Sequence, residues 1–222
     1  MKQVYINITG VLRDTFAKAA SEYRKYYIES DSEDEESFEY DMVLPVNTND
    51  ISNHFKFQDE DELKYFFFIE FAMEIFGHSA PTYMGAFKDL TDLLKEKKDW
   101  EITIVSDELG KGKAASLFFM SKNSSYVDNY KFYKKDTIDS MWENCDIWIT
   151  TDCEVLEQKP NDKISIKVET EYNKDYESNH SVETLDKVIK LPVIIMHAAK
   201  SIAQAYGFSE NDSTLHINKE VL

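Results

Sequence analysis

The stretch QVYINITGVLRDT, residues 3–15, has the pattern of a buried strand that ends in a tight turn and leads into a helix. β-Branched and aromatic residues dominate positions 3–8, and Thr9-Gly10 ends the run. From Asp14 to about Glu29, apolar side chains recur every three or four residues, which is the spacing of one buried helix face. An Asp at the start of such a helix ordinarily caps it. The chain therefore opens with a predicted strand–turn–helix unit.

From residue 100 onward, short predicted strands alternate with short predicted helices. The strands are expected at 100–106, 129–135, 146–151 and 163–169, and the helices at 113–122, 136–144, 152–158 and 182–206. Together with the first unit they make five βα units. Such alternation indicates an α/β fold with a mostly parallel five-stranded sheet, helices on both faces and right-handed crossovers. Ligands of such sheets bind at the carboxyl ends of the strands.

Residues 30–98 interrupt this alternation after the first βα unit. The stretch 29–41, ESDSEDEESFEYD, contains eight carboxylates and no cation, so self-repulsion is expected to keep it extended. Two helices are predicted behind it, at 59–76 and at 81–98, the second opened by proline. We interpret 30–98 as an acidic loop and helical insertion within a single domain that spans 1–222. The alternatives are an acidic contact site in the loop and a docking surface on the aromatic run of the first helix.

The composition excludes several classes of function. The chain of 222 residues has 42 acidic against 25 basic residues, a net charge of -17, which argues against nucleic-acid partners and against anionic membranes. No run approaches the roughly 18 apolar residues of a membrane span, and the N-terminus lacks the zones of a signal peptide, so we expect a cytosolic protein. Cys145 and Cys153 are expected to be ordinary buried thiols.

The segment from Asn7 to Thr15 resembles the first motif of the haloacid dehalogenase (HAD) superfamily, Asp-x-Asp-Gly-hydrophobic-hydrophobic-x-Asp-Thr. The tail of that motif matches well. The resemblance implies a HAD-like Rossmannoid fold and gives roles to three further positions. Ser106 ends the second strand where the family has Ser or Thr, Lys134 or Lys135 is placed like its lysine, and Asp152 is placed like its metal-binding carboxylate.

The sequence departs from the family at the two residues that perform its chemistry. The nucleophilic Asp is replaced by Asn7, whose neutral amide is a poor nucleophile, and the general acid is replaced by Thr9. The remaining metal ligands would be Asn7, Thr9 and Asp152, with Asp107 or Glu154 at the margin, and a hard cation prefers more carboxylate than this. We therefore expect no cofactor, a weak magnesium site being the alternative, and a non-catalytic HAD-like pseudoenzyme.

A non-catalytic domain of this kind is expected to bind protein partners in a larger assembly. The usage of 23 lysines against two arginines is similar to coding in A/T-rich genomes such as those of tailed (crAss-like) gut bacteriophages, which implies a structural virion subunit of the tail, collar or neck, made in a host cytoplasm. Two alternatives stay open. One is a magnesium-dependent phosphatase or nucleotidase that uses Asp14 or Asp152. The other is a phosphate or nucleotide sensor, for which the predicted helix start at 110–113 offers backbone donors and two ammonium groups.

Overall fold

The computed structural model describes residues 1–29, 39–42 and 54–191. Its strands are β1 (Lys2–Asn7), β2 (Trp100–Ser106), β3 (Asn129–Phe132), β4 (Ile147–Thr150), β5 (Ile164–Val168) and β6 (His180–Val182). Its α-helices are α1 (Thr15–Tyr23), α2 (Glu60–Tyr65), α3 (Ala86–Glu96), α4 (Lys111–Lys122), α5 (Ile138–Glu143), α6 (Cys153–Glu157) and α7 (Leu185–Ile189). Wider π-helical turns occur at η1 (Arg24–Ile28), η3 (Phe66–Glu70) and η4 (Met73–Gly77), and a tight 3₁₀ turn at η5 (Lys135–Thr137).

Met1–Ile189 forms one compact unit, and Lys190–Leu222 forms a second. Almost all of the second unit lies outside the described residues, and so does most of the predicted helix 182–206, of which α7 is the described part. Most of the acidic stretch 29–41 also lies outside them.

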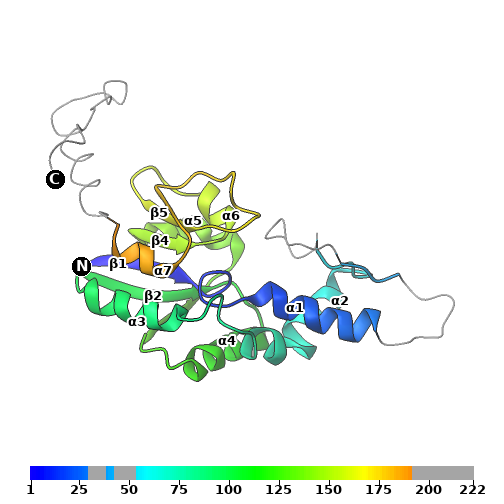
Figure 1. The fold of residues 1–222 in the computed structure, drawn as a ribbon. Helices are drawn as coiled ribbons and strands as arrows, with labels where there is room; N and C mark the ends of the chain where they lie inside the picture. Colours follow the sequence, from blue (N-terminus) through cyan, green and yellow to red (C-terminus); the bar gives the residue numbers. More distant parts are fainter. Residues whose placement is uncertain (30–38, 43–53, 192–222) are drawn as a thin grey trace. The chain divides into compact units, whose positions relative to one another are not determined.

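The sheet of the first unit is parallel throughout, as predicted. Its strand order is β3-β2-β1-β4-β5-β6, and each neighbouring pair runs parallel. The predicted five strands were one too few, because β6 has only three residues and is too short to show an alternating pattern. The chain leaves β1 toward β2 and β3 and later returns to β4 on the other side of β1 (Figure 1). This reversal places a topological switch point between the carboxyl ends of β1 and β4.

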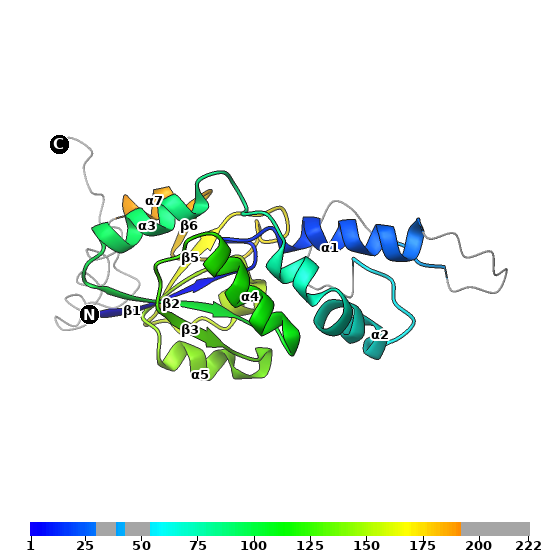
Figure 2. The same cartoon turned by 90° about the horizontal axis from the view of Figure 1, so that it is seen from below.

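Helices cover the two faces of the sheet. On one face α3 packs against α7, and Figure 2 shows these two helices side by side. α3 also meets α4 through the rings of Phe87 and Phe119, whose centroids are 5.5 Å apart. On the other face, α5 buries Trp142 against Trp148 of β4 at a ring separation of 4.9 Å. Helices therefore pack on both faces of the sheet.

The helical segment between β1 and α3 builds a separate aromatic cluster. Tyr23 of α1 and Phe66 and Phe67 of η3 are buried in it. These two phenylalanines therefore pack in a core, which counts against the alternative of a docking surface at their positions. The predicted helix 59–76 divides into α2, η3 and η4, which ends at Gly77. We call the group α1, η1, α2, η3 and η4 the helical lobe.

The helix predicted at 81–98 begins later than expected. Pro81 forms an antiparallel bridge with Arg13 instead of opening the helix. Gly85 then takes a positive φ of 115°, and α3 starts at the next residue. The proline therefore joins the loop after β1 to the chain that leaves the helical lobe.

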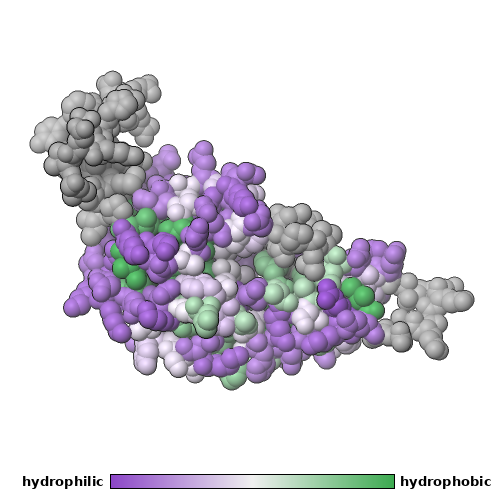
Figure 3. All heavy atoms as spheres, viewed as in Figure 1, coloured by the Kyte–Doolittle hydropathy of each residue, from purple (hydrophilic) through white to green (hydrophobic). Residues whose placement is uncertain are grey.

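Hydrophilic residues cover most of the face seen in Figure 3, with smaller apolar areas between them. Among the described residues, no helix combines the length and the apolar character that a bilayer crossing requires.

Candidate functional site

A cavity of about 80 Å³ lies where the carboxyl ends of β1, β2 and β4 meet the helical lobe. Its polar lining consists of Asn7, Thr9, Asp107, Glu108, Lys135, Thr151 and Asp152 from the sheet side, together with Thr15 at the start of α1. Aromatic rings of the lobe and of a later turn close the other side, namely Phe16, Phe67, Phe68, Phe76 and Tyr172. The cavity is therefore at the switch point, where parallel sheets bind ligands, and it has room for only a few heavy atoms.

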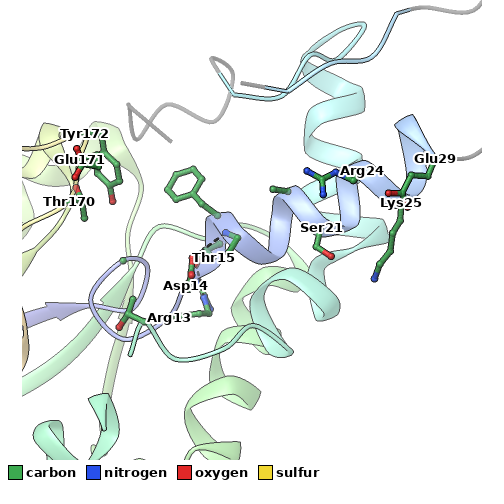
Figure 4. Close-up of a pocket in the computed structure, with 15 residues that line it drawn as sticks. Arg13, Asp14, Thr15, Ser21, Arg24, Lys25, Glu29, Thr170, Glu171 and Tyr172 are labelled. Atoms are coloured by element: carbon green, nitrogen blue, oxygen red, sulfur yellow. Dashed lines mark hydrogen bonds between the residues drawn. The ribbon is translucent and has the colours of Figure 1, made fainter. Parts of the chain in front are cut away.

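A larger groove of about 640 Å³ adjoins this cavity along α1. Figure 4 shows Arg24 and Lys25 on the helix side of the groove and Glu171 on the facing turn. Phe16 and Tyr172 line both the groove and the cavity, and their ring centroids are 6.1 Å apart. This aromatic pair is the wall that the two spaces share.

Two residues of the first motif behave as the sequence predicts. Asp14 caps α1, since its Oδ1 accepts a 3.1 Å hydrogen bond from the backbone N–H of Ala17. Gly10 has a positive φ of 77°, and a Cβ at this position would lie 2.3 Å from Oγ1 of Thr151. The turn therefore requires glycine, both for its backbone conformation and for the approach of the chain after β4.

The side chain of Asn7 is fixed by two buried aromatic residues. Its Oδ1 accepts a 2.6 Å hydrogen bond from Nε1 of Trp148. Its Nδ2 donates a 3.1 Å hydrogen bond to the hydroxyl of Tyr133. Burial raises the pKa of Tyr133 well above its usual range, with the carboxylates of Asp107 and Asp152 adding to the effect, so the phenol stays neutral. Both polar atoms of the Asn7 amide are therefore hydrogen-bonded to buried aromatic side chains.

Arg13 organises the loop after β1 and was not predicted as a site residue. It is fully buried, and its Nε donates to Thr15, while Nη1 donates to the carbonyl of Phe76 at 3.0 Å and to Ser116 at 2.7 Å. Nη2 donates to Thr9 and forms an ion pair with Glu108. Burial lowers the pKa of Arg13, and Glu108 acts in the opposite direction. All five guanidinium N–H groups thus have acceptors, and they tie the sheet, the lobe and α4 together.

Asp107 and Asp152 place two carboxyl groups with raised pKa values in the cavity. Burial raises the pKa of Asp107 to about 7, and the nearby carboxylates of Glu108 and Asp152 add to this shift. Burial also raises the pKa of Asp152, although Lys135 opposes the shift. Oδ1 of Asp152 accepts a 2.9 Å hydrogen bond from the backbone N–H of Glu154 and so caps α6. A carboxyl group that titrates near neutral pH, as that of Asp107 does, is suited to proton transfer.

Of the two lysines, Lys135 lines this cavity, although it is exposed, as is Lys134, which precedes the turn η5 as its N-cap. Nζ of Lys135 lies 2.9 Å from Oε1 of Glu154. Burial acts to lower the pKa of Lys135, but the contact with Glu154 and the proximity of Asp152 raise it overall. Lys135 therefore contributes a positive charge beside the two aspartates.

Ser106 ends β2 as predicted, but it does not line the cavity. Its Oγ is buried and has no hydrogen-bond partner among the described residues. The lysines near the start of α4 also lie apart from the cavity. Lys111 donates to the carbonyl of Ile69 at 3.3 Å, and Lys113 lies over the ring of Phe132.

The ligand set expected for magnesium does not fit a divalent cation. Oδ1 of Asn7 is occupied by the indole of Trp148, and the backbone carbonyl of Thr9 accepts a 3.2 Å hydrogen bond from Thr151. Asp152 is engaged in capping α6. Within 1–29, 39–42 and 54–191, no group of three or more His, Cys, Asp or Glu side chains is arranged to hold a metal ion.

The sequence matches no protein-family model and no curated protein. Solved structures do resemble the chain. One is a proposed haloacid dehalogenase-like hydrolase from Burkholderia xenovorans LB400, with a TM-score of 0.54 at 10% identity, covering 86% of this chain and 97% of that one. Another is a dehalogenase with an intermediate complex, with a TM-score of 0.49 at 12% identity, covering 85% and 95%. The first of these likenesses confirms the predicted HAD-like fold.

The prediction that the chain is a pseudoenzyme is contradicted by the first of these likenesses, since the fold extends over nearly the whole of a protein described as a hydrolase. The prediction rested on Asn7 and Thr9 alone. With Asn7 and Thr9 at these positions, the chain lacks the family's nucleophile and its general acid. Asp107, Asp152 and Lys135 nevertheless lie at the same edge of the sheet. Neither the fold nor the comparisons support a virion or bacteriophage role, and protein partners stay a prediction.

Proposed function

We propose that the chain is a hydrolase that cleaves a small ester by general acid–base catalysis in the cavity at the carboxyl edge of the sheet. The observation that carries this proposal is the Asp107 carboxyl group, which lines the cavity and has a pKa raised to about 7. A general base is most effective when its pKa lies near the working pH, because it is then both available and basic.

In this proposal, Asp107 accepts a proton from a water molecule whose oxygen attacks the ester carbonyl. The proton then passes from Asp107 to the departing alkoxide, so that an acid and an alcohol are formed and Asp107 is regenerated. Lys135 supplies positive charge for the oxyanion that develops on the carbonyl oxygen. The side chain of Asn7 is held in place by hydrogen bonds to Trp148 and Tyr133 and lines the cavity beside the reacting groups.

Phosphate monoesters are poorer candidates for this cavity. Asp107, Glu108 and Asp152 all line it, whereas Lys135 is the one basic side chain in its described lining. A dianionic substrate would be repelled by these carboxylates. A neutral ester meets no such penalty.

The test is a pH–rate profile on a panel of small substrates, namely methyl acetate, 2-chloropropionate and methyl phosphate, with the formation of methanol or lactate followed by proton NMR. We expect methyl acetate to be hydrolysed, with a rate that rises with pH through a midpoint near 7. Asp107→Asn should lower this rate at least about 100-fold. Asp139→Asn, a matched change at an exposed position of α5, should leave it unchanged.

Absence of methyl acetate hydrolysis would overturn the proposal. So would an Asp107→Asn protein that stays folded and retains the full rate. Hydrolysis confined to methyl phosphate would point instead to a phosphatase with an altered centre.

A further inference from the structure

One carboxylate oxygen in the cavity lacks a partner. Glu108 is only 3% exposed, and its Oε1 receives both the guanidinium of Arg13 and, at 3.3 Å, the hydroxyl of Thr9. Its Oε2 is buried and has no hydrogen-bond partner among the described residues. Leaving a buried charged acceptor unsatisfied is costly. Glu108 is one of the residues that line the cavity.

The two cationic side chains at this site, Arg13 and Lys135, have other partners. All the N–H groups of Arg13 have other acceptors or reach Glu108 through Oε1. Lys135 forms its ion pair with Glu154. In this arrangement Oε2 receives no hydrogen bond from Arg13 or from Lys135.

The surroundings of Oε2 favour a cation. Asp107 and Asp152 line the same cavity, so a positive ligand meets three carboxyl groups and one lysine. The opposite wall carries the rings of Phe67, Phe68 and Phe76. Aromatic faces attract ammonium groups, and they also pack against a short alkyl chain.

We propose that Glu108 is a substrate-binding residue, and that its Oε2 accepts a hydrogen bond from the primary ammonium group of a small amine-bearing substrate in this cavity. The inference rests on the proposed function, because it names the substrate class of the same site. An alcohol would offer a donor without the charge, and a carboxylate would be repelled. The cavity volume of about 80 Å³ limits the bound portion to a few heavy atoms.

Binding can be measured apart from catalysis by NMR titration with four probes of similar size. They are n-propylammonium, 1-propanol, propionate and tetramethylammonium, which carries a positive charge but no N–H donor. We expect n-propylammonium to bind the wild-type protein at least about tenfold more tightly than each of the others. Tetramethylammonium controls for general attraction to a chain with a net charge of -17.

Variants then locate the contact. Glu108→Gln should remove the preference for n-propylammonium over 1-propanol, whereas Asp139→Asn should retain it. Because Glu108→Gln also alters the buried pair with Arg13 and can impair folding, the comparison of probes on the wild-type protein is decisive by itself. Equal binding of the four probes, stronger binding of propionate, no binding of n-propylammonium, or a preference that survives in folded Glu108→Gln would each overturn the inference.

Asp107→Asn separates this inference from the proposed function. If it binds n-propylammonium but no longer hydrolyses methyl acetate, both hold. If it binds n-propylammonium and hydrolysis is undiminished, the proposed function fails while the binding site stands. If hydrolysis requires Asp107 but the wild-type protein shows no ammonium preference, the inference alone fails.

Discussion

Nε1 of Trp148 donates a 2.6 Å hydrogen bond to Oδ1 of Asn7. Trp148 pairs with Tyr5 across β1 and β4, so its indole reaches along β1 to the last residue of that strand. Nδ2 of the same amide donates to Tyr133. An amide suits this position because it provides an acceptor for the indole and a donor for the phenol at once.

Replacing Asn7 with Leu should destabilise the protein by about 2 kcal/mol, because it leaves the indole N–H of Trp148 buried without an acceptor. Chemical denaturation of Asn7→Leu, Trp148→Phe and the double variant forms a cycle that isolates the pair. We expect the double variant to be more stable than the sum of the single effects by roughly 1 kcal/mol. Additive effects would show that the hydrogen bond contributes nothing beyond packing.

Arg13→Met should be more damaging, at about 3–5 kcal/mol, because it leaves the Glu108 carboxylate buried without its counter-charge. Adding Glu108→Leu to this variant should recover part of the loss, since the pair is then replaced by apolar side chains. Urea denaturation measures both variants. Arg24→Met is the matched control: Arg24 is exposed on η1, and we expect little change there. A double variant less stable than Arg13→Met would contradict this account.

The sequence predicted those parts of the site that depend on local patterns. The glycine turn at Gly10, the cap at Asp14 and the strand end at Ser106 all follow from neighbouring residues. The contact between Arg13 and Glu108 joins residues 95 positions apart, and no local pattern indicates it. One signal was available, since Arg13 is one of two arginines in a lysine-rich chain, and arginine is favoured in buried ion pairs.

The sequence predicts Asp107 only as a marginal metal ligand, because local patterns do not reveal its surroundings in the folded chain. Its raised pKa depends on burial, on the adjacent Glu108 and on Asp152, and both the burial and the approach of Asp152 arise only when β1, β2 and β4 align. The start of α3 was misplaced for a related reason, because the bridge of Pro81 to Arg13 is a tertiary contact that overrides the usual helix-opening role of proline. Long-range burial and pairing, rather than secondary structure, decide the chemistry of this site.

Asp107 should also make stability depend on pH. Its folded-state pKa of about 7 lies above the unfolded value of about 3.9. The folded state therefore holds the proton more tightly, and the stability that this gives is present at low pH and is lost as pH rises toward 7. Asp107→Asn cannot lose a proton, so its melting temperature relative to the wild type should be higher at pH 8 than at pH 5. Thermal melts at the two pH values measure this difference, with Asp139→Asn as the control, and an Asp107→Asn difference independent of pH would contradict the prediction.

Lys167 holds the turn that carries Tyr172. Its side chain is buried, and Nζ donates to three backbone carbonyls, those of Asn173 at 3.0 Å, Lys174 at 3.1 Å and Tyr176 at 2.8 Å. One ammonium group thus satisfies the carbonyls of a turn that has no ladder of its own. Because Tyr172 forms the shared wall of the cavity and the groove with Phe16, the position of this wall depends on Lys167.

Lys167→Met should therefore cost about 3 kcal/mol, since charge-assisted hydrogen bonds are lost and their acceptors stay buried. We expect the turn at 170–176 to lose more stability than the rest of the fold. Amide hydrogen exchange in 170–176 should accelerate more than exchange in β1 or β2, because the turn opens while the sheet remains paired. Lys174→Met is the matched control, since Lys174 is exposed and pairs with the equally exposed Glu171, so it should change neither stability nor exchange appreciably. Uniform acceleration across the sheet and the turn would mean that Lys167 supports the fold as a whole and does not specifically position the wall of the cavity.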